Sequence, residues 1–394
     1  MPFYRSVGEI PAKRHTLAGP ADQPHAEELM GLNGFSSSSA LLYHRRSPSA
    51  LVSIESADDP RTTDRQCARP DHPLVPRHLR TGDLPTGTDL VTGRHVLLAN
   101  RDVTVAVARA DTTSPLYRTA LGDELTFVQS GRAPLETTFG SLDVAPGDYV
   151  VVPTATTHRW VIDEGIVETF VIEARGGHIA PPRKYLGPYG QFLEGAPYCE
   201  RDLRGPTEPL LADGHDVEVL VRSAGGLSRH IHRDHPFDVV GWDGGLWPYA
   251  LSIHDFEPIV GLIHQPPPVH QTFEGPGFVI CSFVPRYFDF HPQAVKVPYH
   301  HANVDSDEVL FYSAGNFMSR AGSGIGVGSI SYHPAGFVHG PQPGSRERSE
   351  GVDRTEEVAV MLDTFRPLGV TDLARSVSDE NYAWSWSQSG SNTP

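Results

Sequence analysis

Cysteine is scarce in this sequence, and the features of membrane and secreted proteins are missing. The three cysteines, Cys67, Cys199 and Cys281, are odd in number and widely spaced. They therefore form neither a CxxC pair nor a disulfide framework, which favours a reducing compartment. No apolar run reaches the roughly 18 residues of a membrane-spanning helix, and the first residues lack the apolar core of a signal peptide. We therefore expect a cytoplasmic protein without a membrane partner.

Basic residues are also too few for a protein that grips a polyanion. The chain has 32 Lys and Arg against 48 Asp and Glu, a formal net charge of −16. Its longest basic clusters are pairs such as Arg45-Arg46 and Arg183-Lys184. Proteins that bind a nucleic-acid backbone usually carry a basic patch. We therefore expect no nucleic acid as partner.

Turn-forming residues are plentiful instead, with 38 Gly and 35 Pro in 394 residues. They separate short runs of β-prone residues, which favours an all-β class built from sandwiches or barrels. A chain of this length has room for two domains. The runs are His95–Leu98, Val103–Ala108, Leu125–Val128, Asp148–Val152, Val167–Ile172, Phe278–Val284, Val309–Tyr312, Gly328–His333 and Val358–Leu362.

Three segments do not fit this strand pattern. Residues 1–80, with the Ser run Ser36–Ser39, predict an irregular wrap over the surface. The Pro- and Gly-rich segment 176–255 connects the two β-rich stretches and has helical potential near Glu208–Asp213. The Ser-rich tail from Trp384 to Pro394 is expected to be frayed.

The two β-rich stretches carry the same motifs and indicate an internal repeat. Glu124 is followed after six residues by Gly131, and Glu308 after six residues by Gly315. Gly147-x5-Pro153-x-Ala155-x2-His158 matches Gly328-x5-Pro334-x-Gly336-x2-His339. The glutamates are 184 residues apart and the histidines 181, so two motifs agree at nearly one offset.

The repeated unit resembles the cupin family, whose motifs are G-x5-H-x-H-x3,4-E-x6-G and G-x5-P-x-G-x2-H. The second copy reads His301-x-Asn303-x4-Glu308-x6-Gly315, with Asn303 where many cupins have a second His. The resemblance implies a double cupin with few short helices. Residues 1–255 would form an N-terminal domain with a metal-free cupin core at about 95–175, and residues 256–394 the catalytic cupin.

Two His and one Glu survive in the second copy, at His301, Glu308 and His339. This is the ligand set of a ferrous facial triad, which leaves open positions for substrate and dioxygen. Zinc enzymes use the same set, so the ligands alone do not select iron. Asp307 is the alternative carboxylate, and His300 is expected to be a packing neighbour. The first copy keeps Glu124 and His158 but has no His before the Glu, so we expect no metal there.

The wider chain resembles homogentisate 1,2-dioxygenases from end to end. The runs that carry the resemblance are Phe3-Tyr4-Arg5, Gly31-Leu-Asn-Gly-Phe35, His235-Pro-Phe-Asp-Val-Val-Gly-Trp-Asp-Gly244, His264-Gln-Pro-Pro-Pro-Val-His-Gln-Thr-Phe273, Asn303-Val-Asp-Ser-Asp-Glu308, His333, His339-Gly-Pro341 and Tyr382-Ala-Trp-Ser-Trp386. The resemblance implies Fe(2+) as cofactor, a small aromatic substrate with O2, and a homo-oligomer, a hexamer built from trimers.

The resemblance also implies roles for single residues. His264 would be the base beside the substrate hydroxyl, since an imidazole is suited to accept a proton near neutral pH. His333 would lie in the substrate site, and His270 is the next candidate there. The family places a Tyr nine residues after the ligand Glu, against the substrate carboxylate, but this chain has Phe317. Tyr312 or Arg320 could supply the missing donor.

Several readings of function stay open from the sequence. The leading one is ring cleavage of homogentisate to maleylacetoacetate, in tyrosine and phenylalanine catabolism. Phe317 leaves room for another hydroquinone or catechol, in a biosynthetic pathway for example. A non-catalytic binding or storage protein, and an isomerase or hydrolase with zinc or manganese, are the alternatives from other classes.

Two further motifs resemble functional sites but are interpreted as structural. His230-x-His232-x2-His235 resembles a metal cluster, but its Asp234 is poorly placed to share an ion with His235. The glycine-rich run Gly322–Gly328 fails GxGxxG spacing and leads into a β run, so we expect a turn.

Overall fold

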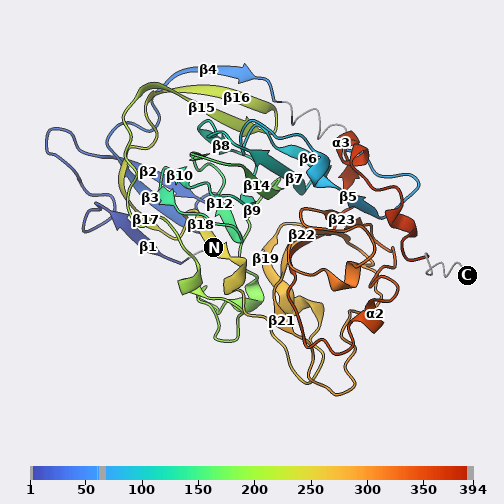
Figure 1. Ribbon diagram of the computed structural model, residues 1–394. Helices are drawn as coiled ribbons and strands as arrows, with labels where there is room; N and C mark the ends of the chain where they lie inside the picture. Colours follow the sequence, from blue (N-terminus) through green and yellow to red (C-terminus); the bar gives the residue numbers. More distant parts are fainter. Residues whose placement is uncertain (1–2, 60, 62–67, 388–394) are drawn as a thin grey trace, which may run out of the picture. The chain divides into compact units, whose positions relative to one another are not determined.

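The computed structural model describes residues 3–59, 61 and 68–387, and the chain divides into two compact units (Figure 1). The first unit comprises Met1–Thr63, Thr86–Arg94 and Val107–Ser252. The second comprises Asp64–Pro85, His95–Ala106 and Ile253–Pro394. Segments 64–85 and 95–106, which the sequence analysis places in the N-terminal domain, thus belong to the second unit. Cys67 lies outside the described residues, and Cys199 and Cys281 are not joined in a disulfide.

The larger sheet of the first unit has seven strands in the order β11-β10-β13-β8-β15-β16-β4. Their bounds are β4 Leu51–Ala57, β8 Tyr117–Thr119, β10 Leu135–Thr137, β11 Gly140–Leu142, β13 His158–Trp160, β15 His215–Ser223 and β16 Gly226–Asp234. β8 and β15 run parallel, and the other pairs are antiparallel.

A second sheet of this unit joins β18, β12, β9 and β14 in that order. Their bounds are β9 Glu124–Ser130, β12 Asp148–Val152, β14 Val167–Ala174 and β18 Tyr249–Ser252, while β7, Val103–Ala110, is divided between the units after Ala106. All five residues of β12 are buried. A β-branched run without alternation is typical of a strand covered on both faces.

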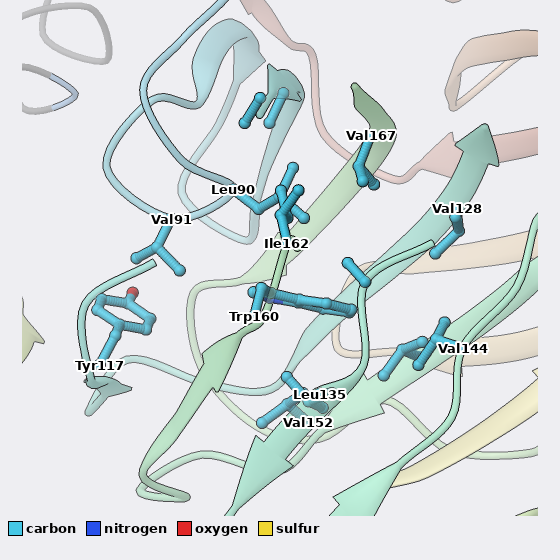
Figure 2. Packing of buried hydrophobic residues seen from close by; sticks show 14 of the residues in the cluster. Leu90, Val91, Tyr117, Val128, Leu135, Val144, Val152, Trp160, Ile162 and Val167 are labelled. Carbon is cyan, nitrogen blue, oxygen red and sulfur yellow. The ribbon is translucent and has the colours of Figure 1, made fainter. Parts of the chain in front are cut away.

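The core of the first unit lies between these two sheets (Figure 2). Trp160 of β13 is 1% exposed and lies amid aliphatic side chains from both sheets, among them Leu135 of β10 and Val152 of β12. Tyr117 of β8 is fully buried at the same core. This core fixes the strands that carry the first copy of the repeated motif.

A four-stranded antiparallel sheet, β1-β17-β3-β2, completes the strands of the first unit. Its bounds are β1 Arg5–Gly8, β2 Ala26–Gly31, β3 Ser39–His44 and β17 Val239–Gly244. Residues 1–80 were expected to be irregular, but the described part of this range contains five strands, β1 to β5, with irregular segments between them. These strands are short, and β1 pairs with a strand more than 200 residues away, so no local pattern announces them.

The second unit is built on a six-stranded antiparallel sheet, β19-β20-β25-β22-β23-β5. Its bounds are β5 Arg77–Leu79, β19 Gln271–Gly275, β20 Phe278–Phe283, β22 Asp307–Ala314, β23 Ile330–His333 and β25 Val358–Thr364. Two short pairs accompany it: β6 His95–Ala99 with β26 Gly369–Val370, and β21 Arg286–Tyr287 with β24 Arg354–Thr355.

Helices are short throughout the part of the chain that is described. The α-helices are α2 Ser345–Arg348 and α3 Asp372–Ser376, and the 3-10 helices are η1 Thr81–Asp83, η2 Arg183–Tyr185, η3 Glu200–Asp202, η4 Ile253–Asp255, η5 Pro267–His270, η6 Met318–Arg320 and η7 Tyr382–Trp384. No helix in the described ranges combines the length and hydropathy that crossing a bilayer requires. The fold is therefore all-β, as predicted, and consists of two cupin-type units.

One local prediction is wrong, and a second is wrong for the part that the structure describes. Glu208–Asp213 forms no helix. Pro209 restricts Glu208 to extended backbone, which opposes a helix there. The start of the tail is ordered rather than frayed, because Trp386 donates its indole N–H to the carbonyl of Gly340 at 3.0 Å. The rest of the tail, 388–394, lies outside the described residues.

Candidate metal centre

The second unit brings His301, Glu308 and His339 together through its strand pairing. Glu308 is the second residue of β22, and it pairs with His333 on β23, which lies beside β22 (Figure 1). His301 and His339 lie outside the strands but form a backbone bridge to each other, with N···O distances of 2.8 and 2.9 Å. Hydrogen bonds of the main chain therefore hold all three side chains at one end of this sheet.

The three side chains offer two nitrogens and a carboxylate to one point. Their candidate ligand atoms all lie within 4.8 Å of one another. Glu308 Oε1 is 3.2 Å from His339 Nε2, and Glu308 Oε2 is 3.6 Å from His301 Nε2. The side chains of Glu308 and His339 are 5% and 1% exposed, whereas that of His301 is 33% exposed. The centre is thus buried on one side and accessible beside His301.

Backbone carbonyls orient both imidazole rings of this group. His301 Nδ1 donates to the carbonyl of Tyr299 at 3.2 Å, and His339 Nδ1 donates to that of Phe337 at 3.1 Å. Each bond keeps the proton on Nδ1 and leaves the Nε2 lone pair free to face the centre. This is the arrangement in which metal-binding histidines are usually held.

Glu308 is kept ionised in spite of its burial. Burial alone would raise the pKa of its carboxyl, but hydrogen bonds with His301, His333 and His339 hold that pKa well below its usual range. The ring of His333 donates Nδ1–H to Glu308 at 2.9 Å and accepts the hydroxyl of Tyr382 at Nε2, also at 2.9 Å. Burial lowers the pKa of His333 to about 3, so this ring stays neutral. The negative charge of Glu308 is buried among imidazole rings, so a cation bound there would be stabilised by it.

Comparison with known proteins shows which family this chain resembles. The family model "Homogentisate 1,2-dioxygenase N-terminal" matches residues 38–253. A protein of Saccharolobus solfataricus, named only as a candidate dioxygenase, is 38% identical over 98% of this chain and 99% of its own length. A homogentisate 1,2-dioxygenase of Emericella nidulans is 27% identical over 79% of this chain and 75% of its own length.

The chain belongs to the homogentisate 1,2-dioxygenase family. Membership makes it an enzyme, an oxidoreductase of the ring-cleaving dioxygenase type. Among solved structures, protein Ylba from E. coli is similar over 77% of this chain and 96% of its own, with 8% identity and a TM-score of 0.37.

The alternative carboxylate, Asp307, points away from the centre of this dioxygenase. Its Oδ1 accepts the backbone N–H of Ala335 at 2.8 Å. Its Oδ2 accepts the N–H of Leu368 at 2.7 Å and the hydroxyl of Tyr332 at 2.9 Å. The exposed His300 packs against Gly340, where an added Cβ would lie 2.7 Å from its Nδ1.

A second carboxylate, which no sequence motif marks, lies beside Glu308. Asp363 of β25 pairs with Glu308 across the sheet, and Asn303 donates its side-chain amide to Asp363 at 3.0 Å. Burial, followed by the charge of Glu308, raises the pKa of Asp363 to about 7. Asn303 thus occupies the position of the second cupin His, and its side chain donates a hydrogen bond to Asp363.

Three of the predicted substrate residues form one buried cluster, which is linked to the centre by a hydrogen bond to Gly340. The phenyl ring of Phe317 packs edge-on against Tyr312 at a centroid distance of 4.9 Å. Arg320 donates Nε–H to the Tyr312 hydroxyl at 3.0 Å and Nη1–H to the carbonyl of Gly340, next to His339, at 2.7 Å. The hydroxyl of Tyr312 and the guanidinium of Arg320 therefore already have partners within the protein.

The predicted base, His264, lies on an exposed loop before η5, with 60% of its side chain exposed. Its Nδ1 donates to Asp289 at 2.9 Å, which leaves Nε2 as the proton acceptor. The ring of Tyr299 contacts the rings of both His264 and His301, at centroid distances of 5.5 and 6.2 Å. Asp289 and Tyr299 were missed, since no motif marks them.

The remaining candidate residue, His270, contacts a phenylalanine ring, and the two other motifs are described by their local structure. The ring of His270 packs on Phe283 at 4.7 Å, and burial lowers its pKa to about 3. In the described part of the chain, the histidines at 230, 232 and 235 do not form a second group that could hold a metal ion. Turns occupy much of the glycine-rich run at 322–328, and Gly322, Gly324 and Gly328 have φ values of 92°, 83° and 81°.

Proposed function

We propose that this chain is an Fe(2+)-dependent dioxygenase that cleaves the aromatic ring of homogentisate with O2 to give maleylacetoacetate. One observation carries the proposal: His301, Glu308 and His339 bring their ligand atoms within 4.8 Å in a member of the homogentisate 1,2-dioxygenase family. The products of such a reaction fit tyrosine and phenylalanine catabolism in the cytoplasm.

The donor set fits ferrous iron. Two imidazole nitrogens and one carboxylate are the ligands of non-haem iron oxygenases, and they leave positions open on one side of the ion. The bound iron would supply a site at which substrate and dioxygen meet. The accessible side of His301 faces solvent, while Glu308 and His339 are buried, so the open positions would lie beside His301.

His264 would act as the base on the substrate hydroxyl. Asp289 holds its Nδ1 proton, so Nε2 is the atom that takes up a proton from the hydroquinone. The ring of Tyr299, between His264 and His301, spaces this acceptor from the centre. A base on an exposed loop would also return the proton to solvent after each turnover.

Direct substrate contacts are expected from Phe317, Tyr312, Arg320 and His270, and an indirect contribution is expected from His333. Arg320 is the buried cation of this set, and burial, which would lower the pKa of its guanidinium, is outweighed by the neighbouring Tyr312, Tyr382 and Glu308. A positive charge beside the centre suits the carboxylate of homogentisate, for which Phe317 offers no donor. His333, which holds Glu308, would act on the substrate through that carboxylate.

A homo-oligomer, a trimer or a hexamer, would cover the surface around the centre. Tyr299, Val304 and Val338 lie next to or near the ligands in sequence, and they are 52%, 83% and 65% exposed. Large apolar side chains gathered near a site favour burial by a partner. We propose that a second copy of this chain supplies it.

The test begins with anaerobic purification and counting of iron per chain. The iron-loaded enzyme is then given homogentisate in an oxygen electrode, while the ultraviolet absorbance of the product is followed. We expect one iron per chain, O2 uptake equal to product formed, and loss of both in His301→Ala. The neighbouring, exposed His300 provides a matched control, since His300→Ala should keep iron and turnover.

Phe317 favours one second candidate, the same ring cleavage on a hydroquinone or catechol without the carboxylate. Such a compound would then be turned over with a higher kcat/KM than homogentisate. Full iron loading without turnover of any hydroquinone would overturn both candidates in favour of a binding or storage protein. Activity with zinc or manganese and without O2 would point to an isomerase or hydrolase.

A further inference from the structure

The first unit reproduces the backbone of the metal centre almost bond for bond. The N–H of Ala155 donates to the carbonyl of Thr119 at 2.8 Å, as that of Gly336 donates to Asn303 at 2.7 Å. The Nδ1 of His158 donates to the carbonyl of Thr156 at 3.0 Å, as that of His339 does to Phe337 at 3.1 Å. The scaffold of a metal site is thus present twice, and side chains decide how each copy is used.

The strand registers identify the equivalent side chains. Tyr117 pairs with His158 as His301 pairs with His339, so Tyr117 stands where the first histidine ligand would be. The neighbours of the central glutamate follow the same rule. Glu124 pairs with Val152 and Glu173, where Glu308 pairs with His333 and Asp363.

The guanidinium of Arg94 has no counterpart among the three candidate ligands of the second unit. Its Nη2 donates to Glu124 at 3.0 Å and its Nη1 to Glu173 at 2.7 Å, so one guanidinium bridges both carboxylates. The hydroxyl of Tyr117 donates to the other oxygen of Glu124 at 2.9 Å. The side chains of Arg94, Glu124 and Glu173 are 1%, 3% and 7% exposed.

We propose that the guanidinium of Arg94 is a built-in cation that replaces the metal ion of the first cupin. Arg94 and Tyr117 thereby hold closed a latent divalent-metal site formed by Glu124 and His158. The Nε2 of His158, the atom that would face such an ion, is buried and has no hydrogen-bond partner among the described residues. An unpartnered nitrogen in this position is the donor that a metal would use.

Charge balance explains why the arrangement is stable. Glu173 also contacts Arg61 at 3.4 Å, and Asp59 contacts Arg61 and Arg222 at 3.2 and 2.8 Å. With Arg94 and Glu124, three guanidiniums face three carboxylates, all buried. Burial would raise the pKa of Glu173, but the charges of Arg222, Arg94 and Arg61 bring it down to about 2. Without Arg94 this network would carry one uncompensated negative charge, which is strongly unfavourable in a protein interior.

The latent site can be opened by two substitutions. Arg94→Ala/Tyr117→His would place an imidazole, Glu124 and His158 around the vacated position, which is the ligand set of the second unit. After loading with Co2+ and removal of free ion, we expect this variant to hold one more cobalt per chain than the wild type. Its melting temperature should rise on adding Co2+ by more than that of the wild type. The readout is a difference between variants, so it does not depend on which ion the second unit takes or on activity.

Two controls make the result decisive. Tyr117→His alone keeps the guanidinium and should take up no additional cobalt, and neither should Arg94→Lys/Tyr117→His, in which the position stays positively charged. Extra cobalt in either control, or none in a folded Arg94→Ala/Tyr117→His, overturns the proposal.

A stability comparison covers the case in which the double variant does not fold. Arg94→Ala should be destabilised, and Arg94→Ala/Glu124→Gln should recover stability because the network is neutral again. Urea denaturation of the two proteins measures this difference. No recovery would mean that Arg94 contributes packing rather than charge, which would overturn its role as a cation.

Discussion

At the scale of single residues, the two adjacent acids of the motif have separate tasks. Asp307 binds two backbone N–H groups and a tyrosine hydroxyl, and so ties the loop after β23 to the start of β22. Glu308, one residue on, points to the other face of the strand and meets His301, His333 and His339. Alternation along a strand thus assigns structure to one acid and the metal centre to the next.

His333 is expected to position Glu308 rather than to bind substrate. It is fully buried, and it links the Glu308 carboxylate to the Tyr382 hydroxyl. Changing such a supporting partner typically costs about 10- to 100-fold in metal affinity. We therefore predict a loss of that size in His333→Ala and partial recovery in His333→Gln, which keeps a donor. Competition with a chelator measures the affinity, and an unchanged affinity in His333→Ala would refute the positioning role.

Phe317→Tyr tests the substrate assignment. The new hydroxyl would lie beside the Tyr312 and Phe317 ring contact, near the buried Arg320. If homogentisate places its carboxylate there, an added donor should lower KM by about tenfold or more, because one hydrogen bond to a charged group contributes about 1.5–3 kcal/mol. Steady-state kinetics with homogentisate and with a hydroquinone that lacks the carboxylate provide the comparison. An equal change for both substrates would show that the carboxylate lies elsewhere.

The sequence predicted that His301, Glu308 and His339 lie together, because each sits in a spaced motif. It could not predict Tyr299 and Asp363, which contact His301 and pair with Glu308, or Asp289, which contacts His264. Nothing in their local sequence marks them, since their role depends on a contact made by folding. The same limit applies to Arg94, which lies 30 residues before Glu124 and acts on it only through the fold.

At the scale of elements, strands with continuous β-branched runs were predictable and strands with distant partners were not. Asp148–Val152 has the same bounds as β12, because all of its residues are buried. β3 instead combines a short mixed sequence with a partner, β17, that is supplied late in the chain, and β2 pairs only with β3. What identifies β3 is its contact with β17, which propensity cannot reveal.

His44 joins three of these elements, and its titration should make their stability depend on pH. Its ring bonds Asp238, just before β17, at 2.6 Å and Glu28 of β2 at 3.0 Å. Burial would lower its pKa, but the two carboxylates raise the pKa of His44 to about 9. The stabilisation is therefore complete below the unfolded value of about 6.5 and is lost as the pH rises through 9.

The size of this effect follows from the shift. At about 1.4 kcal/mol per pKa unit, the free energy of unfolding should fall by up to about 3 kcal/mol between pH 6.5 and 9. Urea denaturation across this range should show the fall in the wild type and a flatter profile in His44→Gln. His15, whose side chain is 93% exposed beside the partly buried Glu27, offers the control variant His15→Gln, which should keep the fall in the free energy of unfolding. A profile that His44→Gln does not flatten would contradict this account.

At the scale of the whole molecule, we propose that one motif is used twice, once with a removable metal ion and once with a cation fixed to the chain. A chelator should therefore affect only the second copy. If the metal is present at about 100 times its Kd, its removal costs about 2.7 kcal/mol of stability.

Hydrogen exchange should then show faster exchange in β22 and β23, around Glu308 and His333, after chelation. The equivalent strands β9 and β12, around Glu124 and Val152, serve as the internal control and should keep their protection, because Arg94 stays in place. Equal loss of protection in both copies would mean that the first copy also binds a metal ion, and that Arg94 does not replace it.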